Sequence, residues 1–134
     1  MKKISAIIFL LALATTISAS FIQHLSSDVI EDIGNAIKSG KATAVSKYFN
    51  STLDLTIPGN EGTYSKPQAE LILKEFFSKN PPKSFAVNHQ GSSNDGSLYA
   101  IGNYVSGSVT FRTYFLLKKV NTGYLMQKLE FEED

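Results

Sequence analysis

The sequence predicts an α+β fold in which helices from the N-terminal half pack on a curved antiparallel sheet. Apolar residues recur at helical spacing before residue 80, and beyond residue 83 they alternate with polar residues in long segments separated by glycine-bearing turns. The chain is 43% hydrophobic and has no cysteine, so an apolar core has to stabilise it without disulfides.

The first 20 residues are typical of a secretory signal peptide, so one domain is expected over residues 21–134. Lys2 and Lys3 precede a low-polarity run, Ile4–Ala14, that is followed by small residues. A membrane-spanning helix needs about 20 apolar residues, and this run is shorter. No cysteine follows it for lipid attachment. We therefore expect a periplasmic or secreted product with no membrane anchor after cleavage.

Charge and composition exclude several functions. The chain has 13 basic and 12 acidic residues. Removal of the signal peptide would take away Lys2 and Lys3, so the mature protein would have 11 basic and 12 acidic residues and a formal charge of −1. Such a chain has no excess of clustered Lys and Arg of the kind that binding to nucleic acid requires. His24 and His89 are far apart, and no cysteine or carboxylate triad accompanies them. We expect neither a nucleic-acid partner nor a metal or other cofactor.

Two helices are expected before residue 50. Residues 27–40 carry isoleucines at helical spacing, with acidic residues near the start and a lysine and Gly40 at the end, as the helix dipole favours. A shorter helix over residues 41–49 has one apolar face and is ended by Asn50 and Ser51.

A short strand and a third helix follow. Residues 53–57 (LDLTI) alternate as in a strand, and the glycines of residues 58–64 favour a turn. Ser65 and Gln68 form a capping box, which predicts the start of the third helix. Its apolar stripe consists of Ala69, Ile72, Leu73, Phe76 and Phe77, and prolines at 81 and 82 end it.

The remainder is expected to be a meander of four strands near residues 84–90, 98–105, 108–119 and 123–131. Ser106 and Gly107 suit a tight hairpin. In the third of these strands, both faces carry large side chains. This pattern predicts a strand in the middle of the sheet, with helices on one side and a partner or a thin cover on the other.

These elements resemble the cone-shaped fold of the nuclear transport factor 2-like (cystatin-like) superfamily. More narrowly, LTIPGNEGTYSKPQAELILKEFFSKNPPKSF, HQGSS, YAIG, TFRTYFLLKK and YLMQKLEFEE are similar to the domain-of-unknown-function family 4783, over roughly residues 27–132. That resemblance implies a small exported protein of Gram-negative bacteria and supports the fold. It implies no activity, and no catalytic motif of the superfamily's enzymes matches here.

His89 is the one candidate for acid–base chemistry. It ends a predicted strand and is expected on the face of Phe85 and Val87, toward the core or a cavity, where an imidazole can act as a general base. The alternative is a structural histidine at the rim of the sheet. The loop of residues 91–96 leads into a strand, not a helix, so it is expected to be a hairpin turn and not a phosphate cradle.

Four further residues are candidates for a ligand site or cavity lining: Tyr64, Tyr104, Arg112 and Tyr114. Arg112 lies between aromatic neighbours and needs a partner there. The alternatives are an internal carboxylate such as Asp54 or Glu130, an interface, or the carboxylate of a ligand.

Two classes of function remain open. The first is an exported non-catalytic domain that uses its cone cavity or sheet face to bind an apolar small molecule, an envelope protein or a second copy of itself. The alternative is a small isomerase- or dehydratase-like enzyme with His89 as base and Tyr64 or Tyr104 as hydrogen-bond donor.

Overall fold

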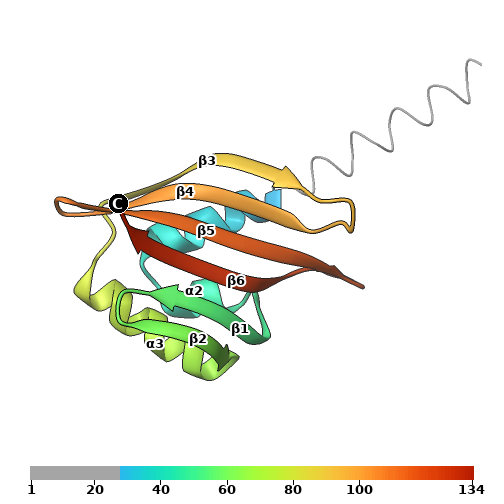
Figure 1. Cartoon of the computed structure of the whole chain (residues 1–134), viewed down its shortest axis with the longest axis horizontal. Coiled ribbons are helices and arrows are strands. Elements are labelled where there is room, and N and C mark those ends of the chain that lie inside the picture. Colours follow the sequence, from blue (N-terminus) through green and yellow to red (C-terminus); the bar gives the residue numbers. More distant parts are fainter. Residues whose placement is uncertain (1–27) are drawn as a thin grey trace, which may run out of the picture. The chain divides into compact units, whose positions relative to one another are not determined.

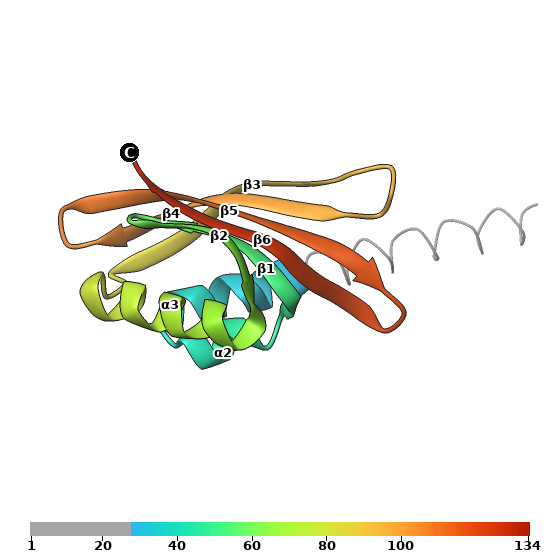
Figure 2. The ribbon, with the colours of Figure 1, turned by 60° about the horizontal axis from the view of Figure 1, so that its bottom comes forward.

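The computed structural model describes residues 28–134, and the predicted signal peptide lies outside these residues. Residues 31–134 form one compact unit, to which the following description applies. It contains one six-stranded sheet in the order β2-β1-β6-β5-β4-β3, with helices against one of its faces (Figures 1 and 2). The predicted α+β architecture is confirmed.

The helices agree with the sequence prediction in number and order. The first occupies residues 28–39 of the described chain, followed by α2 (Ala42–Ser46) and α3 (Lys66–Lys79). The predicted capping box of α3 is present: Ser65 accepts a hydrogen bond from the Gln68 backbone, and the Gln68 side chain accepts one from the Ser65 backbone. Helix α2 is shorter than predicted because the chain turns extended at Phe49.

The first part of the sheet was only partly predicted. Strand β1 runs over Phe49–Ile57, longer than the predicted residues 53–57, and β2 (Asn60–Ser65) replaces the predicted turn. The tight turn between them uses a positive φ of 86° at Gly59, and the two strands pair antiparallel. The residues of β2 are mostly exposed and give the strand no apolar face. The alternation of apolar and polar residues that predicts a strand was therefore missing.

The four long strands lie where they were predicted: β3 (Ser84–Ser92), β4 (Leu98–Ser106), β5 (Val109–Val120) and β6 (Gly123–Glu133). Gly107 takes a positive φ of 56° in the β4–β5 hairpin. One pairing departs from an all-antiparallel sheet, since β1 runs parallel to β6. Local periodicity does not reveal this contact between strands from opposite ends of the domain.

The two faces of the sheet differ sharply. On the helix side, β5 contributes a row of buried side chains, and β1 and β6 contribute further apolar residues. The fully or almost fully buried side chains in this layer include Leu53, Leu55, Phe111, Phe115, Leu117, Met126, Leu129 and Phe131. The other face, called the outer face below, has no helix over it in residues 31–134 (Figure 2).

Candidate functional site

An aromatic cluster fills the space between α3 and the sheet. Phe76 and Phe77 of α3 contact Tyr104 of β4, and Phe76 also packs against Phe111 and Phe131, with ring centroids 4.7–5.9 Å apart. Tyr104 is 0% exposed, and its hydroxyl donates to the backbone carbonyl of Asn80. Burial raises the pKa of this phenol. Tyr104 is therefore part of the packed core, and its partner is the chain itself.

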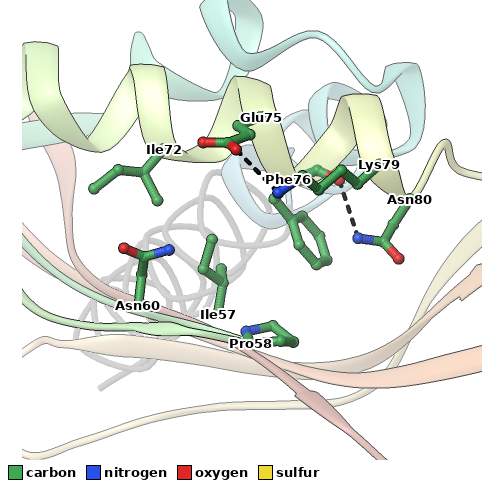
Figure 3. A pocket seen from close by; sticks show the side chains of 8 residues that line it. All are labelled: Ile57, Pro58, Asn60, Ile72, Glu75, Phe76, Lys79 and Asn80. Atoms are coloured by element: carbon green, nitrogen blue, oxygen red, sulfur yellow. Dashed lines mark hydrogen bonds and ion pairs between the residues drawn. The ribbon is translucent and has the colours of Figure 1, made fainter.

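A small pocket opens beside this cluster. Figure 3 shows its lining: Ile57, Pro58 and Asn60 from the β1–β2 turn, and Ile72, Glu75, Phe76, Lys79 and Asn80 from α3 and its end. Its volume is about 150 Å³, and the Glu75–Lys79 ion pair, 3.0 Å long, lies at its rim. Drug-sized ligands occupy pockets of roughly 300–1,000 Å³. None of the predicted cavity residues lines this pocket.

His89 lies on the outer face, so its predicted direction was wrong. Phe85 and Val87 pair with Tyr104 and Gly102 on the helix side, but a bulge between Val87 and His89 inserts one extra residue. Because side chains alternate along a strand, one extra residue turns all that follow to the opposite face. His89 is exposed and pairs with Ile101 instead.

His89, Gly91 and Tyr99 form a local structural unit on β3 and β4. Nε2 of His89 lies 3.2 Å from the Tyr99 hydroxyl. A Cβ atom on Gly91 would lie 2.6 Å from the Tyr99 hydroxyl oxygen and 2.8 Å from carbon atoms of its ring, so this side chain covers the glycine. The following loop is the predicted turn, in which the Ser97 N–H donates to Asp95 over 2.9 Å and lowers the pKa of Asp95. The HQGSSNDG segment thus has a structural explanation.

Four apolar side chains form a block on the outer face of β4 and β5. The register places Tyr99 opposite Leu116 and Ile101 opposite Tyr114, in adjacent rows. All four are half-buried, and no helix of residues 31–134 covers them. We call Tyr99, Ile101, Tyr114 and Leu116 the outer apolar block. Contiguous apolar patches on a surface mark interaction sites when they are large, so this partly exposed block is a candidate for the centre of one.

Next to this block, strands β6, β1 and β2 form a groove of about 260 Å³. Asp54, Glu61, Glu130 and Lys128 line it, which gives three carboxylates and one ammonium group, a net formal charge of −2. Lys128 forms a 2.7 Å ion pair with Glu130, which raises the pKa of Lys128. Asp54 accepts a 2.6 Å hydrogen bond from Thr63. We call this feature the acidic groove.

Arg112 also lies on the outer face, and the structure contradicts its predicted internal salt bridge. It is exposed on β5, opposite Asn103 on one side and Glu132 on the other. Within residues 28–134 it forms no ion pair, either with Asp54 or with Glu130. Glu132 is the carboxylate of the chain directly opposite Arg112, and an interface and a ligand carboxylate stay as the other predicted alternatives.

The structure thus separates the residues predicted to form one cavity. His89, Arg112 and Tyr114 lie on the outer face, whereas Tyr104 is in the core and Tyr64 is opposite Leu53 on the helix side of β2. Strands β2 and β3 are the two edges of the sheet, so Tyr64 and His89 lie at opposite ends of it. The sequence signal for the outer block was the presence of large side chains on both faces of β5.

Metal ligands and membrane spans were also sought. Residues 28–134 contain no group of three or more His, Asp or Glu side chains placed to hold a metal ion. None of the helices in this range combines the length and the hydropathy needed to cross a membrane.

Residues 30–132 match the sequence profile of a family described as a domain of unknown function (DUF4783). Among solved structures, a DUF4783 family protein from Bacteroides ovatus is 31% identical, with a TM-score of 0.72 over 77% of this chain and 93% of its own. One from Bacteroides uniformis is 30% identical, with a TM-score of 0.72 over 78% and 95%.

The fold extends to more distant proteins. An NTF2-like protein of unknown function from Shewanella baltica shares 14% identity, with a TM-score of 0.62 over 86% of this chain and 95% of its own. At this identity the likeness concerns the fold alone, and it agrees with the predicted superfamily. No match was found among curated proteins.

Proposed function

The chain belongs to the DUF4783 family, and we propose that it is a non-catalytic interaction domain that binds its partner through the outer face of its sheet. The observation that carries the proposal is the outer apolar block, Tyr99, Ile101, Tyr114 and Leu116, which lies uncovered beside charged groups. Interfaces combine such an apolar centre, rich in tyrosine, with a polar rim that contains arginine.

The interior supports this choice over ligand binding inside the cone. The aromatic cluster around Phe76 and Tyr104 fills the space that a cavity would need. The pocket beside it has about 150 Å³, below the roughly 300 Å³ at which small-molecule sites begin.

The enzyme alternative has less support because its groups do not meet. His89 is exposed on the outer face, whereas Tyr104 is buried on the helix side and Tyr64 is on the far edge strand. A general base has to lie within hydrogen-bond reach of the reacting group, together with the donor that assists it. His89 instead contacts Tyr99, which covers a glycine.

The proposal includes a location outside the cytoplasm. Its support is the sequence of the first 20 residues, where Lys2 and Lys3 precede the apolar run Ile4–Ala14. N-terminal sequencing of the protein from the bacterial envelope tests this part, and cleavage near residue 20 is expected.

Photo-crosslinking in the producing cell tests the proposal. A photoreactive amino acid replaces Tyr114 in the full chain, and a matched variant carries it at Leu71, which is 64% exposed on α3. A discrete crosslinked species is expected from position 114 and none from position 71. Absence of a product at 114, or equal products at both positions, would contradict an interaction through the outer face.

A further inference from the structure

Four lysines gather where two connecting segments of the chain meet on the helix side. A Cβ atom on Gly40 would lie 2.9 Å from two ring carbons of Pro82, so the turn after the first helix touches the loop between α3 and β3. On each side of this contact, two exposed lysines are close in sequence. We call these residues the basic corner: Lys38, Lys41, Lys79 and Lys83.

The charge of the basic corner is not neutralised by its surroundings. Lys79 pairs with Glu75, whereas the other three lysines form no ion pair within residues 28–134. The acidic C-terminus lies at the same end of the sheet. There, the backbone of Lys83 bonds to β4 and that of Asp134 to β5, so three strand spacings, about 14 Å, separate the two backbones. Physiological salt screens exposed charges beyond about 8 Å.

The charge of the whole unit is divided in the same direction. Residues 31–48 and 66–83, which hold the helices and the loop before β3, contain seven lysines and four acidic residues. Residues 49–65 and 84–134, which hold the strands, contain four basic and seven acidic residues. The formal charge is therefore +3 on the helix part and −3 on the strand part. A negatively charged surface attracts the helix part and repels the strand part.

Helix dipoles account for only two of the four lysines. Lys38 and Lys79 are in the last turns of the first helix and of α3, where a cation is favourable. Lys83 lies beyond the end of α3, and Lys41 is the N-cap residue of α2, where the dipole disfavours a cation and no side-chain capping bond is made. Lys41 and Lys83 are therefore the residues whose charge the fold itself does not use.

The chemistry of the basic corner favours an extended anionic surface over one bound anion. All four residues are lysines, which are hydrated point charges on flexible stems, and none is an arginine, whose planar fork suits a single phosphate. Pro81 and Pro82 have no backbone N–H to donate to an anion. On helices at membrane surfaces, clusters of about four to eight basic residues are typical of binding to anionic lipid headgroups.

We propose that the basic corner binds the surface of an anionic lipid bilayer. The contact is peripheral, made by ammonium groups with lipid headgroups, and it involves no inserted segment. It goes beyond the proposed function, which concerns the outer face. Because the helices lie on one side of the sheet (Figure 2), a domain held by the basic corner leaves the outer apolar block open to its partner.

Co-sedimentation with lipid vesicles tests the proposal on the purified protein in the form that the cell produces. Vesicles of phosphatidylglycerol and phosphatidylcholine in equal parts present an anionic surface, and vesicles of phosphatidylcholine alone are the neutral control. At about 0.1 M salt we expect binding to the anionic vesicles and none to the neutral ones. At about 1 M salt the screening length falls to about 3 Å, so the binding should be lost.

A double variant, Lys41→Gln with Lys83→Gln, tests the location of the contact. A lysine near an anionic surface contributes about fivefold in affinity, so this variant is expected to bind about 25-fold more weakly. The matched control, Lys118→Gln with Lys119→Gln, removes two exposed lysines at the opposite end of the sheet on β5 and should leave binding nearly unchanged. Circular dichroism checks that both variants are folded.

Four outcomes would overturn the proposal. Three are the absence of binding to anionic vesicles, equal binding to both kinds of vesicle, and equal weakening by the two double variants. The fourth comes from inorganic phosphate compared with chloride at the same ionic strength. Displacement of the protein by phosphate alone would assign the basic corner to a single bound phosphate instead of a lipid surface. None of these results decides the role of the outer face, which crosslinking at position 114 tests separately.

Discussion

His89 Nε2 lies 3.2 Å from the hydroxyl of Tyr99, and the side chain of Tyr99 covers Gly91 on the edge strand β3. An aromatic side chain across a glycine on a neighbouring strand shields its backbone and fixes the register. This arrangement gives a structural reason for a histidine, a glycine and a tyrosine to occur together here.

The first prediction concerns this arrangement. Gly91→Ala places a methyl group 2.6 Å from the Tyr99 hydroxyl oxygen and 2.8 Å from its ring, so the ring has to move and we expect the His89 contact to be lost. We expect a loss of about 1 kcal/mol in the free energy of unfolding, measured by urea denaturation. In a Tyr99→Ala background the same change should cost clearly less, since the clash is absent. Equal costs in the two backgrounds would contradict the coupling.

Sequence reasoning predicted α3 because its signals are local. The capping box, the apolar stripe and the final prolines all lie within one segment. The capping box is present and four of the five stripe residues are buried, whereas Ile72 is half-buried. The long strands β4 and β5 were predicted for the same reason, since their alternation is strict.

The sequence prediction was wrong or incomplete where a single extra residue or a pairing with a distant strand determines the structure. The bulge before His89 adds a single residue to β3, leaves no clear mark in the sequence, and turns His89 to the outer face. The acidic groove depends on β1 lying parallel to β6, which brings Asp54 opposite Lys128. Local periodicity cannot show a pairing between residues so far apart in the chain.

The second prediction concerns Gly102 of β4. A Cβ atom there would lie 2.3 Å from the backbone oxygen of Ala86 and 3.1 Å from the Phe85 ring. Because a backbone atom cannot swing away, we expect Gly102→Ala to destabilise the protein by about 2–4 kcal/mol. Thermal unfolding measures the effect. Gly123→Ala is the control, since its Cβ would have no neighbour within 4 Å, and a similar loss in both variants would contradict this account.

The third prediction concerns the start of α3. Ser65→Ala removes the side-chain acceptor for the Gln68 backbone N–H, so the first turn loses its cap. We expect a loss of about 1 kcal/mol in the free energy of unfolding, measured by chemical denaturation. Ser78→Ala, an exposed position near the other end of the same helix, should be neutral or slightly stabilising. If the two variants were equally stable, the capping box would contribute nothing.

The fourth prediction uses Tyr104, whose hydroxyl donates to the Asn80 carbonyl in the aromatic core. Tyr104→Phe removes that donor and leaves a carbonyl without its partner, so we expect a loss of about 1–3 kcal/mol in the free energy of unfolding near neutral pH. Denaturation by urea measures this loss. Tyr124→Phe, a half-buried position on β6, is the control and should cost less.

The same variant has a distinct pH dependence. Burial raises the pKa of Tyr104 in the folded protein, whereas in the unfolded chain a tyrosine has a pKa of about 10. The folded state therefore holds the proton more tightly, and the resulting stability is complete below about pH 10 and declines as the pH rises toward the folded-state pKa. Urea denaturation at several values from neutral pH to about pH 11.5 should show that Tyr104→Phe loses less stability above about pH 10 than the wild type does. Parallel stability curves for the two proteins would mean that this phenol does not resist deprotonation in the fold.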